Sequence, residues 1–157
     1  MTESEDRNED YFRSGTLLIY TIGYEGRSLD DLSQELKSKG IGRLVDVREI
    51  ARSRKPGFSS SRLAEGLFNN GIEYVHMRLL GSPKALREEL KRTGDFNAFA
   101  EAYKRHLRSQ RESLALLSKA ASEKPTVIMC LERDPAYCHR SIIASELQEQ
   151  GFSVRNL

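Results

Sequence analysis

Long apolar segments are missing from this sequence of 157 residues. No run approaches the roughly 20 consecutive apolar residues that a membrane-spanning helix needs, so we expect no membrane partner. The first ten residues are acidic and polar, and they lack the apolar centre of a secretory signal peptide. Together these absences predict a cytoplasmic protein.

Cysteine is scarce, and the two residues present are Cys130 and Cys138. Two cysteines in a cytoplasmic protein are more typical of free thiols than of a structural disulfide. Neither the phosphate-binding pattern GxxxxGK[ST] nor the dinucleotide-binding pattern GxGxxG follows the first apolar run, which argues against ordinary ATP or NAD binding. The prediction is accordingly a protein without a cofactor.

The acidic charge is concentrated at the N-terminus. Residues 1–10 carry five acids and one arginine, so the formal charge of +2 for the chain becomes +6 for residues 11–157. We predict that residues 1–14, which are charged and almost free of aliphatic side chains, form a disordered acidic tail. The whole sequence has 17 arginines against 8 lysines, and arginine suits bidentate phosphate recognition. A nucleotide or nucleic acid is therefore the expected partner, with a solvated basic surface as the alternative.

Short apolar runs alternate with segments of helical spacing along the chain. The spacing predicts strands over 16–22, 43–48, 72–79, 126–132 and 152–156, helices over 28–40, 60–70, 82–92 and 137–150, and one or two helices over 96–121. Strands that alternate with helices imply a parallel sheet with both faces covered. We predict an α/β protein: residues 15–157 form a single Rossmann-like three-layer domain with a mostly parallel sheet of about five strands.

The segment 129–141, MCLERDPAYCHRS, contains both cysteines, one of the three histidines and several charged residues. It is predicted to be the end of one strand, a loop and the start of a helix. In open α/β sheets, ligands bind at the carboxyl ends of the strands. Because these ends share one edge, the polar residues that follow different strands are expected to be neighbours. These residues are Gly23, Tyr24, Asp46, Arg48, His76, Cys130 and Glu132.

Asp46 interrupts a buried strand, and a buried carboxylate needs a partner. One interpretation is a structural ion pair with an arginine such as Arg48 or Arg140. The other is that Asp46 and Glu132 orient a ligand or transfer protons in a cleft.

Cys138 is the better candidate for a nucleophile. It is predicted at the start of the last helix, where the backbone N–H groups favour a thiolate, and His139 and Arg140 are adjacent. Cys130, at the end of a buried strand, is either an inert core residue or a second reactive thiol on the shared edge.

A metal site is a competing interpretation of the same residues. Cys130, Cys138, His139 and His76 offer thiolate and imidazole ligands. However, seven residues separate the cysteines, and adjacent side chains on a helix point about 100° apart. The spacing therefore favours no metal.

The loop 52–58 is the most basic segment of the chain. Its three cations and a Pro-Gly turn suit an anion, and its aromatic side chain is available to stack on a base. The residues expected to bind the ligand here are Arg52, Arg54, Lys55 and Phe58.

The motifs TIGYEGRSLDDL, LVDVR, SRKPGFS, IEYVHMRLLG and CLERDPAYCHR occur in this order. In this combination, over 21–157, the sequence resembles the domain-of-unknown-function family numbered 488. The resemblance implies a compact Rossmann-like domain and a nucleic-acid or stress context, without naming a reaction. Its characteristic residues match Gly23, Asp46, Arg48, Pro56, Gly57, Phe58, His76, Gly81, Cys130, Glu132, Cys138, His139 and Arg140.

Three functions follow from these observations. The first is an enzyme that binds a nucleotide or nucleic acid in a basic cleft, through Arg48, Arg52, Arg54, Lys55 and Arg140, and uses a cysteine thiolate. The second is a non-catalytic module that binds nucleic acid or a phosphorylated partner. The third is a rhodanese-like sulfur carrier.

Overall fold

The computed structural model describes residues 17–157, so the acidic tail predicted for residues 1–14 lies outside the described part of the chain. None of the helices in this part is both long and apolar enough to cross a membrane. Residues 17–157 form five strands, six α-helices and two short 3-10 helices; strands and helices alternate except that three α-helices follow one another between the third and fourth strands. In chain order they are β1 (Leu17–Gly23), α2 (Leu29–Ser38), β2 (Arg43–Asp46), α3 (Ser60–Phe68), β3 (Glu73–His76), η1 (Arg78–Leu80), α4 (Lys84–Thr93), α5 (Phe96–Arg108), α6 (Arg111–Glu123), β4 (Thr126–Cys130), η2 (Pro135–Tyr137), α7 (His139–Glu149) and β5 (Phe152–Asn156).

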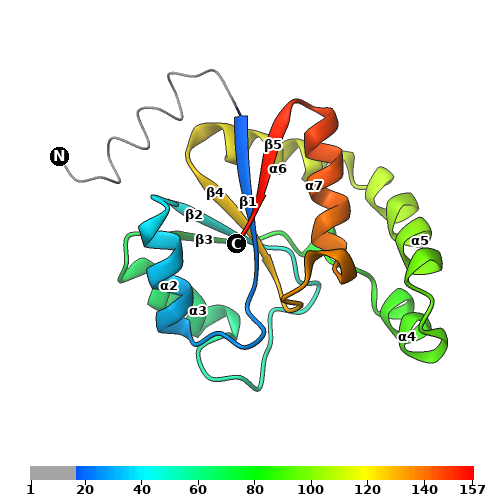
Figure 1. Ribbon diagram of the computed structural model, residues 1–157, viewed down its shortest axis with the longest axis horizontal. Helices are drawn as coiled ribbons and strands as arrows, with labels where there is room; N and C mark the ends of the chain where they lie inside the picture. Colours follow the sequence, from blue (N-terminus) through cyan, green and yellow to red (C-terminus); the bar gives the residue numbers. More distant parts are fainter. Residues whose placement is uncertain (1–16) are drawn as a thin grey trace.

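The five strands form one sheet in the order β3-β2-β4-β1-β5 (Figure 1). Every pair is parallel, so all the carboxyl ends lie on the same edge. β4 is the central strand, and its register places Cys130 beside Gly23 of β1 and Met129 beside Asp46 of β2. The predicted α/β class and parallel sheet are therefore confirmed.

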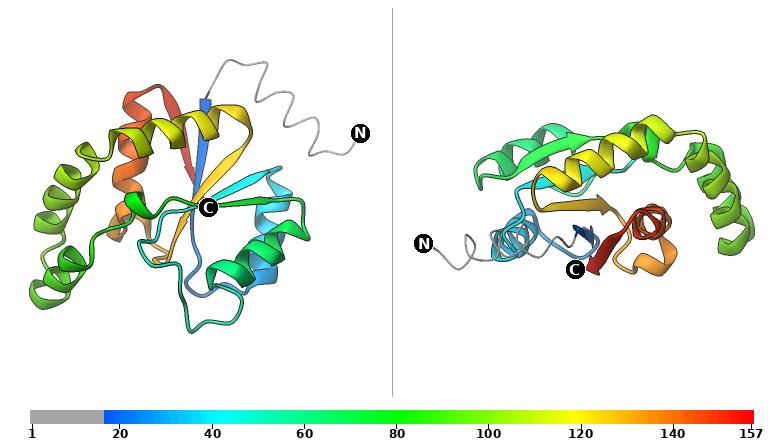
Figure 2. Two further views of the ribbon diagram at one scale, coloured as in Figure 1. Left: turned by 180° about the vertical axis from the view of Figure 1, so that it is seen from behind. Right: turned by 90° about the horizontal axis from the view of Figure 1, so that it is seen from above.

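Two apolar clusters cover the two faces of the sheet. Alternate residues of β4 belong to different clusters, because successive side chains of a strand point to opposite faces: Val127 and Met129 lie in one, Ile128 and Cys130 in the other. The cluster around Val127 and Met129 includes the buried leucines of α2 and α3. The cluster around Ile128 and Cys130 includes residues of α5, α6 and α7. The result is the three-layer arrangement expected of a Rossmann-like domain (Figure 2).

Several helix boundaries follow from local chemistry. Ser28 caps α2 by accepting a hydrogen bond from the N–H of Asp31, whose carboxylate accepts the N–H of Ser28 in return. The predicted helical stretch 96–121 is two helices, α5 and α6, joined at Ser109 and Gln110. The expected helix at Ser82 begins later, at Lys84.

Three predicted strands are longer than the observed ones, and these boundaries were wrong. The strands predicted to reach residues 48, 79 and 132 end at Asp46, His76 and Cys130. The backbone N–H of Arg48 donates to the Asp46 carboxylate, and the chain after His76 turns into η1. The polar residues just beyond each of these strands therefore lie outside the sheet, at the edge where a cleft can form.

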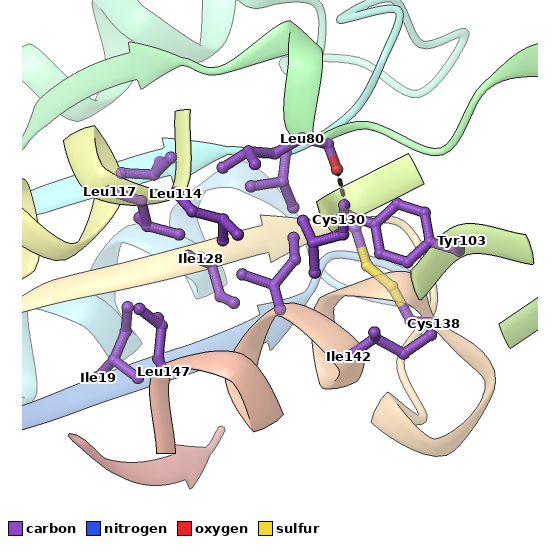
Figure 3. Packing of buried hydrophobic residues seen from close by; sticks show 14 of the residues in the cluster. Ile19, Leu80, Tyr103, Leu114, Leu117, Ile128, Cys130, Cys138, Ile142 and Leu147 are labelled. Atoms are coloured by element: carbon purple, nitrogen blue, oxygen red, sulfur yellow. Dashed lines mark hydrogen bonds between the residues drawn. A yellow bond between two sulfur atoms is a disulfide. The ribbon is translucent and has the colours of Figure 1, made fainter. Parts of the chain in front are cut away.

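Tyr103 anchors the helical layer to the sheet edge. Its side chain is fully buried, and its hydroxyl donates a hydrogen bond of 2.6 Å to the Leu80 carbonyl (Figure 3). We expect Tyr103→Phe to lower the free energy of unfolding by about 1–2 kcal/mol, because the carbonyl loses its donor while the packing is kept. The matched control, Tyr137→Phe, changes an exposed tyrosine and should cost less than about 0.5 kcal/mol. Equal effects in urea unfolding would contradict this assignment.

Candidate functional site

A cavity of about 230 Å³ lies where β1, β2 and β4 end. Its position agrees with the rule that ligands of open α/β sheets bind beyond the carboxyl ends of the strands. Its wall contains positively and negatively charged side chains, a cysteine sulfur and an imidazole. The lining residues are Tyr24, Arg48, Glu49, Ile50, Arg52, Ser82, Arg87, Cys130, Leu131, Glu132 and His139.

Two glycines let the loops around the cavity pack tightly. A Cβ atom on Gly23 would lie 1.8 Å from the carbonyl oxygen of Glu132, so only glycine lets the end of β1 contact the loop after β4. A Cβ atom on Gly81 would lie 2.2 Å from the backbone nitrogen of Glu49, which brings the loop after η1 against the loop after β2. The shape of the cavity therefore depends on both glycines.

Asp46 and Arg48 form a buried ion pair below the cavity. Arg48 donates from Nε to Asp46 Oδ1 at 2.9 Å and from Nη2 to Oδ2 at 2.7 Å, and the carboxylate is fully buried. Burial alone would lower the pKa of Arg48, but the hydrogen bonds and charge of Asp46 outweigh it and raise the pKa. Tyr74 donates a further hydrogen bond of 2.6 Å to Asp46. The carboxylate thus has Arg48 and Tyr74 of β3 as partners, and Asp46 and Arg48 form the ion pair that the sequence offered as one interpretation.

Arg48 also fixes the basic loop. Its Nη1 donates to the Phe58 carbonyl at 2.8 Å and to the Tyr24 hydroxyl at 3.3 Å. Phe58 is fully buried and stacks on Tyr24 with ring centroids 4.5 Å apart. The expectation that Phe58 stacks on a base has no support in this arrangement, because a ligand cannot reach a fully buried ring.

Cys130 and Cys138 are joined in a disulfide, so the prediction of two free thiols was wrong (Figure 3). The prediction rested on the expected compartment, which says nothing of how the chain folds between the two residues. The loop after β4 and the turn η2 reverse the chain between the two residues, and both side chains enter the same buried cluster. Cys130 faces the cavity, whereas Cys138 lies behind it.

His139 is buried beside this sulfur pair. Its Nε2 lies 2.7 Å from the Val47 carbonyl, which can only accept, so Nε2 carries the proton. Its Nδ1 is therefore unprotonated and lies 3.7 Å from Cys138 Sγ. Burial lowers the pKa of His139 to about 4, which keeps the ring neutral at pH 7. The histidine thus presents a lone pair toward the sulfurs.

Arg140 is fully buried and completes the surroundings of Cys130. Its Nη1 donates to Cys130 Sγ at 3.0 Å and to the carbonyl of Glu132, and its Nη2 donates to the carbonyl of Arg133 at 3.2 Å. Burial lowers its pKa, although arginine remains protonated in proteins. Arg140 therefore holds the loop after β4 and places a positive charge against one sulfur.

The remaining predicted residues take different positions. Glu132 lines the cavity, with its Oε2 3.4 Å from Cys130 Sγ. His76 is an exposed residue of the edge strand β3 and contacts the Arg48 carbonyl at 2.7 Å. Lys55 donates to the Tyr24 carbonyl at 3.3 Å, and Arg54 is exposed outside the cavity wall. Of the four loop residues named from the sequence, Arg52 alone lines the cavity.

The sequence analysis missed Glu49, Ser82 and Arg87. Arg87 donates to the Ser82 carbonyl at 2.6 Å and pairs with Glu49 at 3.3 Å, and all three residues line the cavity. They follow the ends of β2 and β3 by several residues, beyond the strand ends that the sequence analysis considered. The predicted helix start at Ser82, directly after a strand, was the available signal.

Comparisons with known proteins give one match. The model of a family described as "Domain of unknown function DUF488" matches residues 28–147, which is more than half of the chain. No curated protein and no solved structure matches this chain.

Proposed function

The chain belongs to the DUF488 family, and from that premise we propose that its cleft binds a nucleotide, with the phosphate at Arg52 and Arg87 and the remainder facing Cys130, Glu132 and His139. The observation that carries this proposal is the cavity itself, because its wall combines the guanidinium groups of Arg52 and Arg87 with the Glu132 carboxylate, an imidazole and a sulfur. Cations in a partly enclosed site attract phosphate more strongly than the same cations in water.

The two arginines differ in how they are held. Arg87 is oriented by Glu49 and the Ser82 carbonyl, so its guanidinium is fixed at the cavity wall. Arg52 is exposed and makes no hydrogen bond or ion pair with another residue of the described chain, 17–157. A fixed guanidinium and a free one together provide a bidentate contact and an adjustable one for a phosphate group.

The size of the cavity favours a small ligand. A volume of about 230 Å³ is below the roughly 300–1,000 Å³ typical of sites for drug-sized molecules. A single nucleotide, or the terminal nucleotide of a strand, suits this volume better than a duplex. The carboxylate of Glu132 supplies a polar partner for a base or sugar.

Arg52→Ala tests this proposal. Titration of the wild type with the four ribonucleoside monophosphates should show binding of at least one of them in calorimetry. The variant should bind that nucleotide roughly 10–100-fold more weakly, because a hydrogen bond to a charged group contributes about 1.5–3 kcal/mol.

Arg54→Ala is the matched control, since it removes an exposed arginine from the same loop but outside the cavity wall. We expect its affinity to stay within about threefold of wild type, as screened surface charges act weakly. The proposal fails if no monophosphate binds, or if the two variants weaken binding equally.

A further inference from the structure

We propose that, when the Cys130–Cys138 disulfide is reduced, Cys130, Cys138 and His139 bind a zinc ion whose fourth position opens to the cleft. The donor atoms of these three buried residues all lie within 4.8 Å of one another. In tetrahedral zinc sites, sulfur and nitrogen ligands stand about 2.0–2.3 Å from the metal, so the two sulfurs, which are bonded to each other in the oxidised chain, must move apart on reduction before both can bind the ion. This inference does not rest on nucleotide binding.

The prediction of no metal rested on Cys138 and His139 both lying in the last helix. Instead, Cys138 is the N-cap of α7 with extended backbone angles, φ −127° and ψ 142°, and only His139 is helical. The two side chains are therefore not separated by a helical step, and Cys138 Sγ and His139 Nδ1 are 3.7 Å apart. Adjacent residues can thus serve as ligands of one ion.

The protonation of His139 suits metal binding. Its Nε2–H is directed at the Val47 carbonyl, 2.7 Å away, and this contact fixes both the ring orientation and the tautomer. Metal-binding histidines usually donate their other ring N–H in this way. The free lone pair of Nδ1 is left on the side of the two sulfurs.

The surroundings of the sulfurs suit thiolates. The backbone N–H of Arg140 donates to Cys138 Sγ at 3.5 Å, and the Arg140 side chain donates to Cys130 Sγ at 3.0 Å. Two thiolates together balance the charge of a divalent ion. The N–H groups of Arg140 stabilise the partial negative charge that each sulfur keeps when it binds the ion. Soft thiolate and imidazole ligands select zinc over magnesium or calcium.

The fourth position is on the cleft side. Cys130, Glu132 and His139 all line the cavity, and Glu132 Oε2 lies 3.4 Å from Cys130 Sγ. Three protein ligands with an opening to a cavity are typical of catalytic rather than structural zinc sites. A water molecule or a ligand group in the cleft would complete the coordination.

Metal binding and the disulfide exclude each other, because both use the same sulfur atoms. Reduction by a water-soluble phosphine breaks the S–S bond: phosphorus supplies two electrons and takes the oxygen of a water molecule, and the two sulfurs take its protons. Zinc binding to the dithiol then releases these two protons. The oxidised protein should therefore bind no zinc at this site.

The test uses the full chain, reduced by a phosphine that is then removed without oxygen. Zinc alone is titrated in competition with a chromophoric chelator, and cobalt(II) reports the ligands through its thiolate charge-transfer absorption. We expect about one zinc ion per reduced chain, and a loss of affinity of roughly 100-fold or more in Cys138→Ser and in His139→Gln. His106→Gln is the matched control, since this histidine is partly buried and lies outside the three-residue cluster.

The inference is overturned if the reduced wild type binds no stoichiometric zinc, or if its cobalt form lacks thiolate absorption. It is also overturned if both substitutions leave the affinity unchanged. The cobalt spectrum of the wild type decides the question even where a variant does not fold. No nucleotide is present, so failure here leaves the proposed nucleotide cleft standing.

Discussion

Arg48→Ala is expected to lower the free energy of unfolding by about 3–5 kcal/mol, as is typical when one partner of a buried ion pair is removed. The Asp46 carboxylate is fully buried and receives two hydrogen bonds from the Arg48 guanidinium. Without that guanidinium, the carboxylate keeps Tyr74 and one backbone N–H as partners but loses its counter-charge. Urea unfolding followed by circular dichroism measures the change.

Arg92→Ala is the control for this prediction. Arg92 also makes two hydrogen bonds to a carboxylate, that of Glu89, but both side chains are exposed on α4. Exposed pairs contribute about 0–1 kcal/mol, because solvent screens the charges. If the two variants were destabilised equally, the desolvated Asp46 carboxylate would not be the source of the effect.

A second large effect is expected for Gly23→Ala. The new methyl group would lie 1.8 Å from the Glu132 carbonyl oxygen and 2.9 Å from the Arg133 Cα atom. Because both contacts are to backbone, the loop after β4 must move, and we expect a loss of about 1–3 kcal/mol in the free energy of unfolding. The same movement displaces the carbonyls that hold Arg140, so ligand affinity in the cleft should fall with stability.

Gly42→Ala is the matched control for this substitution. Its methyl group would meet the Lys124 Cδ atom at 3.1 Å, which belongs to a flexible and partly exposed side chain. We expect a change below about 1 kcal/mol and no change in ligand affinity, since a side chain can move where a backbone cannot. A Gly23→Ala protein with wild-type stability and affinity would show that the contact of β1 with the loop after β4 does not shape the cleft.

The alternation of strands and helices was predictable because burial on both faces of a parallel sheet leaves a continuous apolar run in each strand. The end of each strand was less predictable. Asp46 and Arg48 were placed in one strand by alternation, yet their mutual hydrogen bonds turn the chain out of the sheet at that point. A local side-chain contact of this kind overrides the apolar pattern, and single-sequence periodicity does not register it.

The candidate site was predictable where the fold alone brings residues together. Cys130, Glu132, Arg48 and Tyr24 share the cavity because they follow parallel strands. The contact between the sulfurs of Cys130 and Cys138 was not predictable, because it depends on the backbone conformation of Cys138 at the start of α7. Whether Cys138 was the first helical residue or the N-cap decided where its side chain points, and element boundaries are the least reliable part of such predictions.

The strand order has a consequence for the order of folding. β1 and β2 come first in the chain but do not pair, because β4 lies between them. A growing chain that has not yet reached Thr126 lacks the strand that joins its earlier ones into a sheet. Since the entropy of loop closure opposes long-range parallel pairing, assembly of the full sheet waits for β4. The cleft, whose walls follow β1, β2 and β4, is therefore formed only after β4 has been synthesised.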